Sequence, residues 1–285
     1  MEANLSLKDI VEQELNQEEI DLPIVDTMAV NLGNLLNKED VAFDELAKVI
    51  EKDPALTAKV MNLANSVFYA GLVKVKNVDR AIARVGLMTI RSFLMTVSMK
   101  SVFKGAGAHF EERFKLNWQH SLGCAVCCKR IAEHVKLRSI SEDAYMLGLL
   151  HDLGTISIFN SLTKVSKKQA GPVDLSDNLV NEIIGSFHAS MGAKILGRLN
   201  FEDRFCRIVE LHHSPDDYPD KDDPLFNILY VSNNLLKKIG LAFEPDPHIS
   251  IISLSPSAKL GLDPMFVAML EVDLEDSLEN MENLL

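Results

Sequence analysis

Apolar residues recur every three or four positions along nearly the whole chain, which is the spacing of one face of an α-helix. The apolar residues near the N-terminus follow this spacing: Leu7, Ile10, Val11 and Leu15. No convincing alternation of apolar and polar residues predicts a β-strand. The one candidate, Ile249–Leu254, is interpreted as a short extended connector. The pattern therefore predicts an all-α protein.

Several predicted helices begin or end at residues that favour helix ends. Asp53 and Pro54 predict a start, because an Asp side chain accepts hydrogen bonds from free amide groups and proline suits the first turn. Gly86 predicts the end of a short helix. The expected helices cover residues 7–15, a segment opened by Pro23, and residues 43–50, 54–64, 78–85, 88–102, 118–135, 141–150, 179–187, 188–199, 203–213, 225–239 and 264–284.

The helices are expected to form three parts. A polar, glycine-containing stretch from Lys104 to Glu112 predicts an internal boundary, and Gly and Pro predict a linker at Gly171–Asp177. We expect an N-terminal helical subdomain (residues 1–103) packed on a helical bundle (residues 104–262), and then an acidic C-terminal helix (residues 263–285). The apolar stripe of this helix is expected to dock on the domain or, alternatively, to form a homodimer contact: Leu274, Leu278, Met281 and Leu285.

Composition and charge limit the possible classes of protein. The 285 residues are 47% apolar and 25% charged, which does not fit a largely disordered chain. A net charge of −12 opposes binding to nucleic acid, and the short basic run Lys164, Lys167 and Lys168 is interpreted as a solvated loop. We find no signal peptide and no apolar stretch that could span a membrane, so a cytoplasmic protein without membrane contact is expected.

The four cysteines do not predict a disulfide framework. Cys124, Cys127 and Cys128 lie within five residues of one predicted helix, and Cys206 is far from them. Cys124 and Cys127 have the spacing of half a zinc site, but no second pair of this kind follows. Small buried apolar residues in a reducing compartment are the favoured interpretation.

Histidines on the predicted helices of the second half are the candidate chemistry. They are His120, His151 with the adjacent Asp152, His188, and the pair His212 and His213. Imidazole nitrogens and carboxylate oxygens bind zinc, iron and manganese, and a helical bundle can direct such side chains from several helices to one point. Taken singly, each of these histidines is more typical of a surface or core residue than of a metal ligand.

The segments around these histidines resemble the motifs of the HD superfamily of metal-dependent phosphohydrolases. The matching segments are Trp118–Ser121, Gly148–Gly154, Phe187–Ala193 and Glu210–His213. The last ligand of that family is an Asp on a later helix, and the corresponding stretch here, Tyr230–Asn234, has Asn233 in its place.

The first half resembles one branch of the superfamily, the HDOD (HD-related output domain) family. The matching segments are Leu22–Pro23, Glu45–Ile50, Asp53–Thr57, Asn62–Ser66 and Ala81–Gly86, and the likeness extends from about Leu22 to about Ile239. The resemblance implies an N-terminal helical subdomain packed on an HD-like bundle. It also implies a bacterial signalling or regulatory module, in a family often without demonstrated enzymatic activity.

The resemblance implies a weakened metal site. Its predicted ligands are His120, His151, Asp152, His188, His212, the adjacent His213, and Asn233, which supplies a neutral amide in place of a carboxylate. Zinc, iron, manganese or nickel would suit them, and whether metal is bound stays open. If the chain is active, Asp152 is the expected catalytic residue. Cyclic di-GMP hydrolysis is not inferred, because Thr155 and Ser214–Pro219 depart from the motifs of the family that performs it.

Two functions are therefore expected from the sequence. The favoured one is a non-catalytic signalling module that acts through contact with a protein partner. The alternative is a metal-dependent phosphohydrolase acting on a nucleotide or another phosphate ester. For the partner contact, the loop with Tyr69, Lys74 and Lys76 is predicted to present an exposed aromatic residue among basic neighbours, although an ordinary solvated loop fits equally well.

Overall fold

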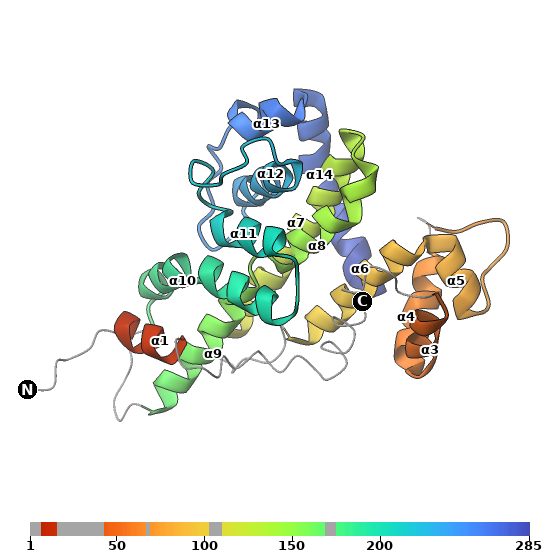
Figure 1. Cartoon of the computed structure of the whole chain (residues 1–285), viewed down its shortest axis with the longest axis horizontal. Coiled ribbons are helices and arrows are strands. Elements are labelled where there is room, and N and C mark those ends of the chain that lie inside the picture. The colour runs from red at the N-terminus through yellow and green to blue at the C-terminus, as the bar shows by residue number, and fades with distance from the viewer. Residues whose placement is uncertain (1–6, 16–42, 67–68, 103–109, 169–174) are drawn as a thin grey trace, which may run out of the picture.

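The computed structural model describes residues 7–15, 43–66, 69–102, 110–168 and 175–285, and these contain helices and no β-strand (Figure 1). The helices are α1 (Leu7–Leu15), α3 (Phe43–Glu51), α4 (Pro54–Ala64), α5 (Val78–Val85), α6 (Leu87–Val102), α7 (Glu111–His134), α8 (Ser141–Leu150), α9 (Leu153–Lys168), α10 (Asp177–Arg198), α11 (Asp203–Leu211), α12 (Pro224–Lys238), α13 (Ser255–Leu260) and α14 (Pro264–Leu284). The predicted all-α class is confirmed.

Helices α3, α4 and α5 form a small lobe, and α6 leads from it to the rest of the molecule (Figure 1). Asp53 begins α4 as predicted, because its carboxylate accepts hydrogen bonds from the amides of Ala55 and Leu56 at 2.8 and 3.1 Å. Asn65 follows α4, and its side chain donates to and accepts from the backbone of Val75 at 3.1 and 2.8 Å. This lobe is therefore held by an apolar interior and by side-chain bonds to the backbone.

The larger part is a bundle in which α7 packs on α8, α9 packs on α10, and α12 packs on both α7 and α8. Two glycines permit the closest approaches between the backbones of neighbouring helices. A Cβ atom on Gly148 would lie 2.6 Å from the carbonyl oxygen of Cys124, and one on Gly154 would lie 2.0 Å from that of His188. Since backbone atoms occupy these positions, glycine is required where α8 meets α7 and where α9 meets α10.

The first and last helices pack on this bundle. Helix α14 lies against α7 and contacts α4, with Leu274 and Leu278 buried. The stripe predicted on α14 is thus at least partly an internal contact, while the exposed apolar residues of this helix are Met265, Met269 and Val272. Helix α1 packs on α9 and α10 through its buried face. The division at residues 103 and 262 stays a prediction.

Several expectations were wrong. Residues 177–198 form one helix, not two that meet at His188; α9 and α13 were not predicted; and residues 251–253 form a 3₁₀ turn instead of an extended connector. Lys164 and Lys167 lie in α9, not in a loop, and Tyr69 is half-buried, not exposed. The helix opened by Pro23, most of the Lys104–Glu112 boundary and the first part of the Gly171–Asp177 linker lie outside the described residues.

Within the described ranges, no helix taken singly has the length and apolar character needed to cross a membrane. Helix α5 and the first part of α6 meet those criteria only together, and they are bent by 108° at their junction.

Candidate metal centre

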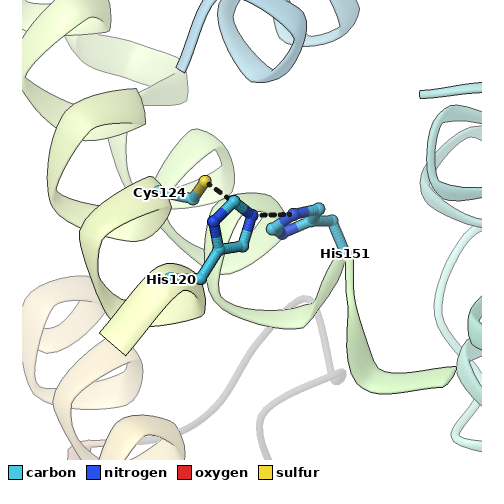
Figure 2. Close-up of side chains that lie close together, drawn as sticks. All are labelled: His120, Cys124 and His151. Carbon is cyan, nitrogen blue, oxygen red and sulfur yellow. Dashed lines mark hydrogen bonds between the residues drawn. The ribbon is translucent and has the colours of Figure 1, made fainter. Parts of the chain in front are cut away.

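Five segments of the bundle bring the predicted ligands together. His120 comes from the middle of α7, His151 and Asp152 from the junction of α8 and α9, and His188 from α10. His212 and His213 follow α11 directly, and Asn233 lies in α12. The side chains of His120 and His151 point toward each other, as Figure 2 shows. Predicted ligands spread over residues 120 to 233 of the sequence thus come together in one place in the fold.

Asp152 lies at the centre of this group. Its Oδ1 atom is 3.5 Å from Nε2 of His151 and 3.6 Å from Nε2 of both His188 and His212. Its Oδ2 atom is 3.6 Å from Nε2 of His120. The carboxylate is 13% exposed, and His151 and His212 are fully enclosed. Four imidazoles therefore surround one largely buried carboxylate; we call these five residues the histidine cluster.

The second ring nitrogen of each imidazole in the cluster is bonded to the backbone. Nδ1 of His120 lies 2.6 Å from the carbonyl oxygen of Leu241, and those of His151, His188 and His212 lie 2.6–2.8 Å from carbonyl oxygens three or four residues earlier. A carbonyl oxygen can only accept, so each Nδ1 must carry the hydrogen. The neutral form of each ring then directs a lone pair from Nε2 into the cluster. The carbonyl bonds fix the tautomer and the orientation of the rings, as such bonds do for histidines that bind metals.

Burial favours this neutral form. It lowers the pKa of His151 to about 4, and it lowers the pKa of His212 well below its ordinary value. Burial alone would raise the pKa of Asp152, but His151 and the other imidazoles outweigh this effect and hold it well below the usual range. At neutral pH the cluster thus presents imidazole lone pairs and a carboxylate to the same space.

Ring nitrogens face one another across the site, and two acceptor atoms have no partner at all. Nε2 of His120 lies 3.2 Å from Nε2 of His151, and Nε2 of His188 lies 3.0 Å from Nε2 of His213. Oδ1 of Asp152 and Nε2 of His212 are buried without a hydrogen-bond partner. Two nitrogens bound about 2.1 Å from one ion are separated by about 3.0 to 3.4 Å, depending on the coordination angle. The spacing and the unpartnered atoms therefore fit a divalent transition-metal ion.

A pocket of about 100 Å³ opens beside the cluster, and it contains residues that the sequence analysis missed. It is lined by Asn233, one of the predicted ligands, and also by Lys237 and Asn117. Asn117 is 1% exposed, and both polar atoms of its amide lack a partner among the described residues. Lys237 lies four residues after Asn233 and Asn117 three before His120, so helical spacing was the signal that could have found them.

Cys124 lies beside the cluster, where it forms with His120 and His151 a group that could hold a metal ion. Sγ of Cys124 lies 3.7 Å from Nε2 of His120, and burial raises the pKa of this thiol well above its ordinary value (Figure 2). Burial also raises the pKa of Cys127 to about 12. All four cysteines are free, and the three on α7 are buried, as predicted.

Comparisons with known proteins place this arrangement in a family. An HDOD domain protein of unknown function from Geobacter sulfurreducens has a TM-score of 0.75 at 22% identity, with 98% of each chain covered. A protein of Shewanella amazonensis described as a candidate metal-dependent phosphohydrolase has a TM-score of 0.64 at 14% identity, with 93% of this chain and 99% of the other covered. These likenesses support the fold.

A third solved structure, from Marinobacter aquaeolei, is described as a candidate signal transduction protein. It has a TM-score of 0.65 at 19% identity, and the match covers 98% of this chain and 66% of the other. A curated relative without an assigned function, from Treponema pallidum strain Nichols, is 22% identical over 225 residues. The match covers 76% of this chain but only 42% of that relative. The sequence model of the HDOD domain matches residues 22–215, and the chain therefore belongs to the HDOD family.

Proposed function

We propose that this chain is a signalling module of the HDOD family that binds a divalent transition metal in its histidine cluster and acts through contact with a protein partner. The observation that carries the metal assignment is the set of Nε2 lone pairs, fixed by four Nδ1–carbonyl bonds, around Asp152. His120, His151, Asp152, His188 and His212 would hold the ion. His213 is the adjacent alternative ligand.

The size of the neighbouring pocket favours regulation over nucleotide hydrolysis. Sites for drug-sized ligands usually occupy about 300–1,000 Å³, whereas this pocket measures about 100 Å³. Asn233 also supplies no negative charge to balance a metal ion. A small group fits beside the ion, but a complete nucleotide does not fit within the pocket itself.

The second candidate is hydrolysis of a small phosphate ester, and Lys237 is the observation that favours it. Lys237 lines the same pocket as Asp152 and His188, and its ammonium group would attract an anion there. A metal ion bound in the cluster would supply Lewis acidity and lower the pKa of a bound water. Lys237 and the unpartnered amide of Asn117 would orient the phosphate oxygens.

The described part of the loop between α4 and α5 is the expected partner contact. Tyr69 is half-buried, but Leu72 and Val73 are exposed, and Lys74 and Lys76 beside them are exposed as well. Apolar side chains with basic neighbours suit a partner that is acidic around an apolar centre. This assignment replaces Tyr69 with Leu72 and Val73 as the apolar contact.

Metal content and turnover distinguish the two candidates. The protein is purified without chelator or histidine tag, its metal is measured by mass spectrometry, and phosphate release is screened with small esters and nucleotides. The regulatory proposal expects bound metal, and no release above that of a variant with His151→Ala and Asp152→Ala. Release that this variant abolishes would favour the hydrolase, while a wild type that takes up no metal would overturn both.

A further inference from the structure

A second and larger cavity borders the C-terminal half of α7, beyond His120, where the N-terminal lobe, the bundle and the last helix meet. Its volume is about 540 Å³, within the range of small-molecule sites. It is lined from α4, α6, α7, α8 and α14 together with Tyr69, and no residue of the cluster belongs to it. The cavity is therefore independent of the proposed metal site.

One side of this junction cavity is apolar. Leu63 of α4 and Phe93 of α6 are each 3% exposed and form part of the wall. Val126 of α7 and Met281 of α14 are half-buried and add to it. A ligand with an apolar body would gain free energy by covering this surface, because apolar area is removed from water.

The cations of the lining already have partners. Nζ of Lys129 lies 2.5 Å from Glu142, and the guanidinium of Arg130 lies 2.8 Å from Asp273. Glu133 and Asp276 are exposed carboxylates of the same lining, and neither forms an ion pair with another described residue. The charge left without a partner in this cavity is therefore negative.

The phenol of Tyr69 adds a neutral polar group. Burial raises its pKa, an effect that Lys129 partly offsets, so the hydroxyl keeps its hydrogen at neutral pH. Tyr145 lies deeper, and its hydroxyl is 2.9 Å from that of Thr96. Tyr69 is thus available to a ligand, whereas Tyr145 is already engaged.

We propose that the junction cavity binds a small organic cation with an apolar body. Its amine or guanidinium group pairs with Glu133 and Asp276, and its body covers Leu63, Phe93 and Met281. An anion would face two free carboxylates with both neighbouring cations already paired. Because α14 supplies one wall and α4 and α6 another, the bound cation ties these segments together and stabilises the folded chain.

Three probes with one apolar body test this assignment: phenylbutylamine, phenylbutanol and phenylbutanoate. Their affinities for the full chain are measured at neutral pH by nuclear magnetic resonance titration. We expect the amine to bind about tenfold more tightly than the carboxylate, with the alcohol in between. Equal affinities for amine and carboxylate, or no saturable amine binding up to about 10 mM, would overturn the proposal.

Variants locate the binding. Glu133→Gln with Asp276→Asn should weaken the amine about tenfold and leave the alcohol unchanged, because only the charges are removed. The control is Glu111→Gln with Glu112→Gln, which removes the same charge from exposed positions at the start of α7 outside the cavity. An equal loss in both variants would mean general electrostatic attraction and would overturn the proposal.

A further variant tests whether the probes occupy the cavity itself. Val126→Trp should fill the cavity and abolish binding of all three probes, with folding checked by circular dichroism. Metal content, measured in parallel, should not change in any variant.

Discussion

Two largely buried carboxylates in this molecule have opposite surroundings. Asp152 in the histidine cluster and Glu142 beside the junction cavity have side chains that are 13% and 15% exposed. Glu142 accepts hydrogen bonds from Thr89, Ser92 and Lys129 at 2.7, 2.6 and 2.5 Å. Oδ1 of Asp152 faces imidazole nitrogens and has no donor. The hydrogen-bond network of Glu142 is complete without a ligand, whereas that of Asp152 is not.

This difference separates a structural group from a binding group. A satisfied buried carboxylate joins elements, and Glu142 joins α8 to α6 and α7. An unsatisfied one carries a desolvation cost, which a bound cation would offset. Completeness of hydrogen bonding, more than burial or residue type, indicates which of the two is a site.

The largest expected effect is on metal binding. Changing His151 and Asp152 together to Ala should weaken binding by about a thousandfold or more, roughly 4 kcal/mol, because the central carboxylate and one nitrogen are lost. Mass spectrometry of the purified protein and calorimetric titration with zinc check this. Glu142→Gln is the control and should keep its metal. Full metal content in the double variant would place the ion elsewhere.

The next largest effect is expected on the stability of the folded chain, when Glu142 is replaced. Glu142→Ala should lower the free energy of unfolding by about 3 kcal/mol, because Lys129 is left partly buried without its partner. Urea unfolding followed by circular dichroism measures the loss. Adding Lys129→Met should restore part of it. A loss of less than about 0.5 kcal/mol would mean that water replaces the carboxylate, as at exposed ion pairs.

Much of the fold could be predicted from the sequence, because apolar residues at helical spacing mark buried faces. The predicted helix start at Asp53 and the predicted helix end at Gly86 are confirmed, because cap residues act on the adjacent turn of the helix. Helix α9 was not predicted, although Ile156 and Phe159 lie three positions apart, at helical spacing, and are fully buried in it. The break expected at His188 does not occur, because no proline interrupts α10 and the hydroxyl of Ser186 donates back to the carbonyl of Glu182 within the helix.

The residues of the cluster could be identified by resemblance, but the hydrogen bonds that orient them could not. The bond from Nδ1 of His120 to the carbonyl of Leu241 joins residues 121 positions apart, so no local pattern encodes it. The same is true of the junction cavity, where α14 meets residues more than a hundred positions earlier. Such features depend on how helices pack, which periodicity alone does not give.

A smaller effect on metal affinity is expected from a substitution that adds a negative charge to the cluster. Asn233 is 2% exposed and lines the pocket with His120 and Asp152, so Asn233→Asp would add a carboxylate beside the metal. We expect about tenfold tighter binding, roughly 1.4 kcal/mol, by calorimetric titration. Asn234→Asp is the matched control on the next residue. Equal affinities of wild type and Asn233→Asp would show that position 233 does not reach the ion.

The smallest effect concerns a third carboxylate, Asp223, which is 3% exposed and resembles Glu142 in being fully bonded. It accepts from the guanidinium of Arg204 and the hydroxyl of Tyr218, and it caps α12 through the amide of Leu225. Burial alone would raise its pKa, but the bonds from Arg204 and Tyr218 lower it overall.

A carboxylate whose pKa is lower in the folded chain stabilises that chain above its unfolded pKa of about 3.9, and this stability is lost as the pH falls toward the folded value. Asp223→Asn keeps the cap but removes the charge, and Arg204 is partly exposed. The variant should therefore be less stable by about 0.5–1 kcal/mol at neutral pH. The difference should shrink as the pH drops below about 4. Urea unfolding at several pH values measures it, and metal content should stay that of the wild type. A difference independent of pH would assign the loss to geometry, and a loss of metal would mean that a satisfied carboxylate also supports the cluster.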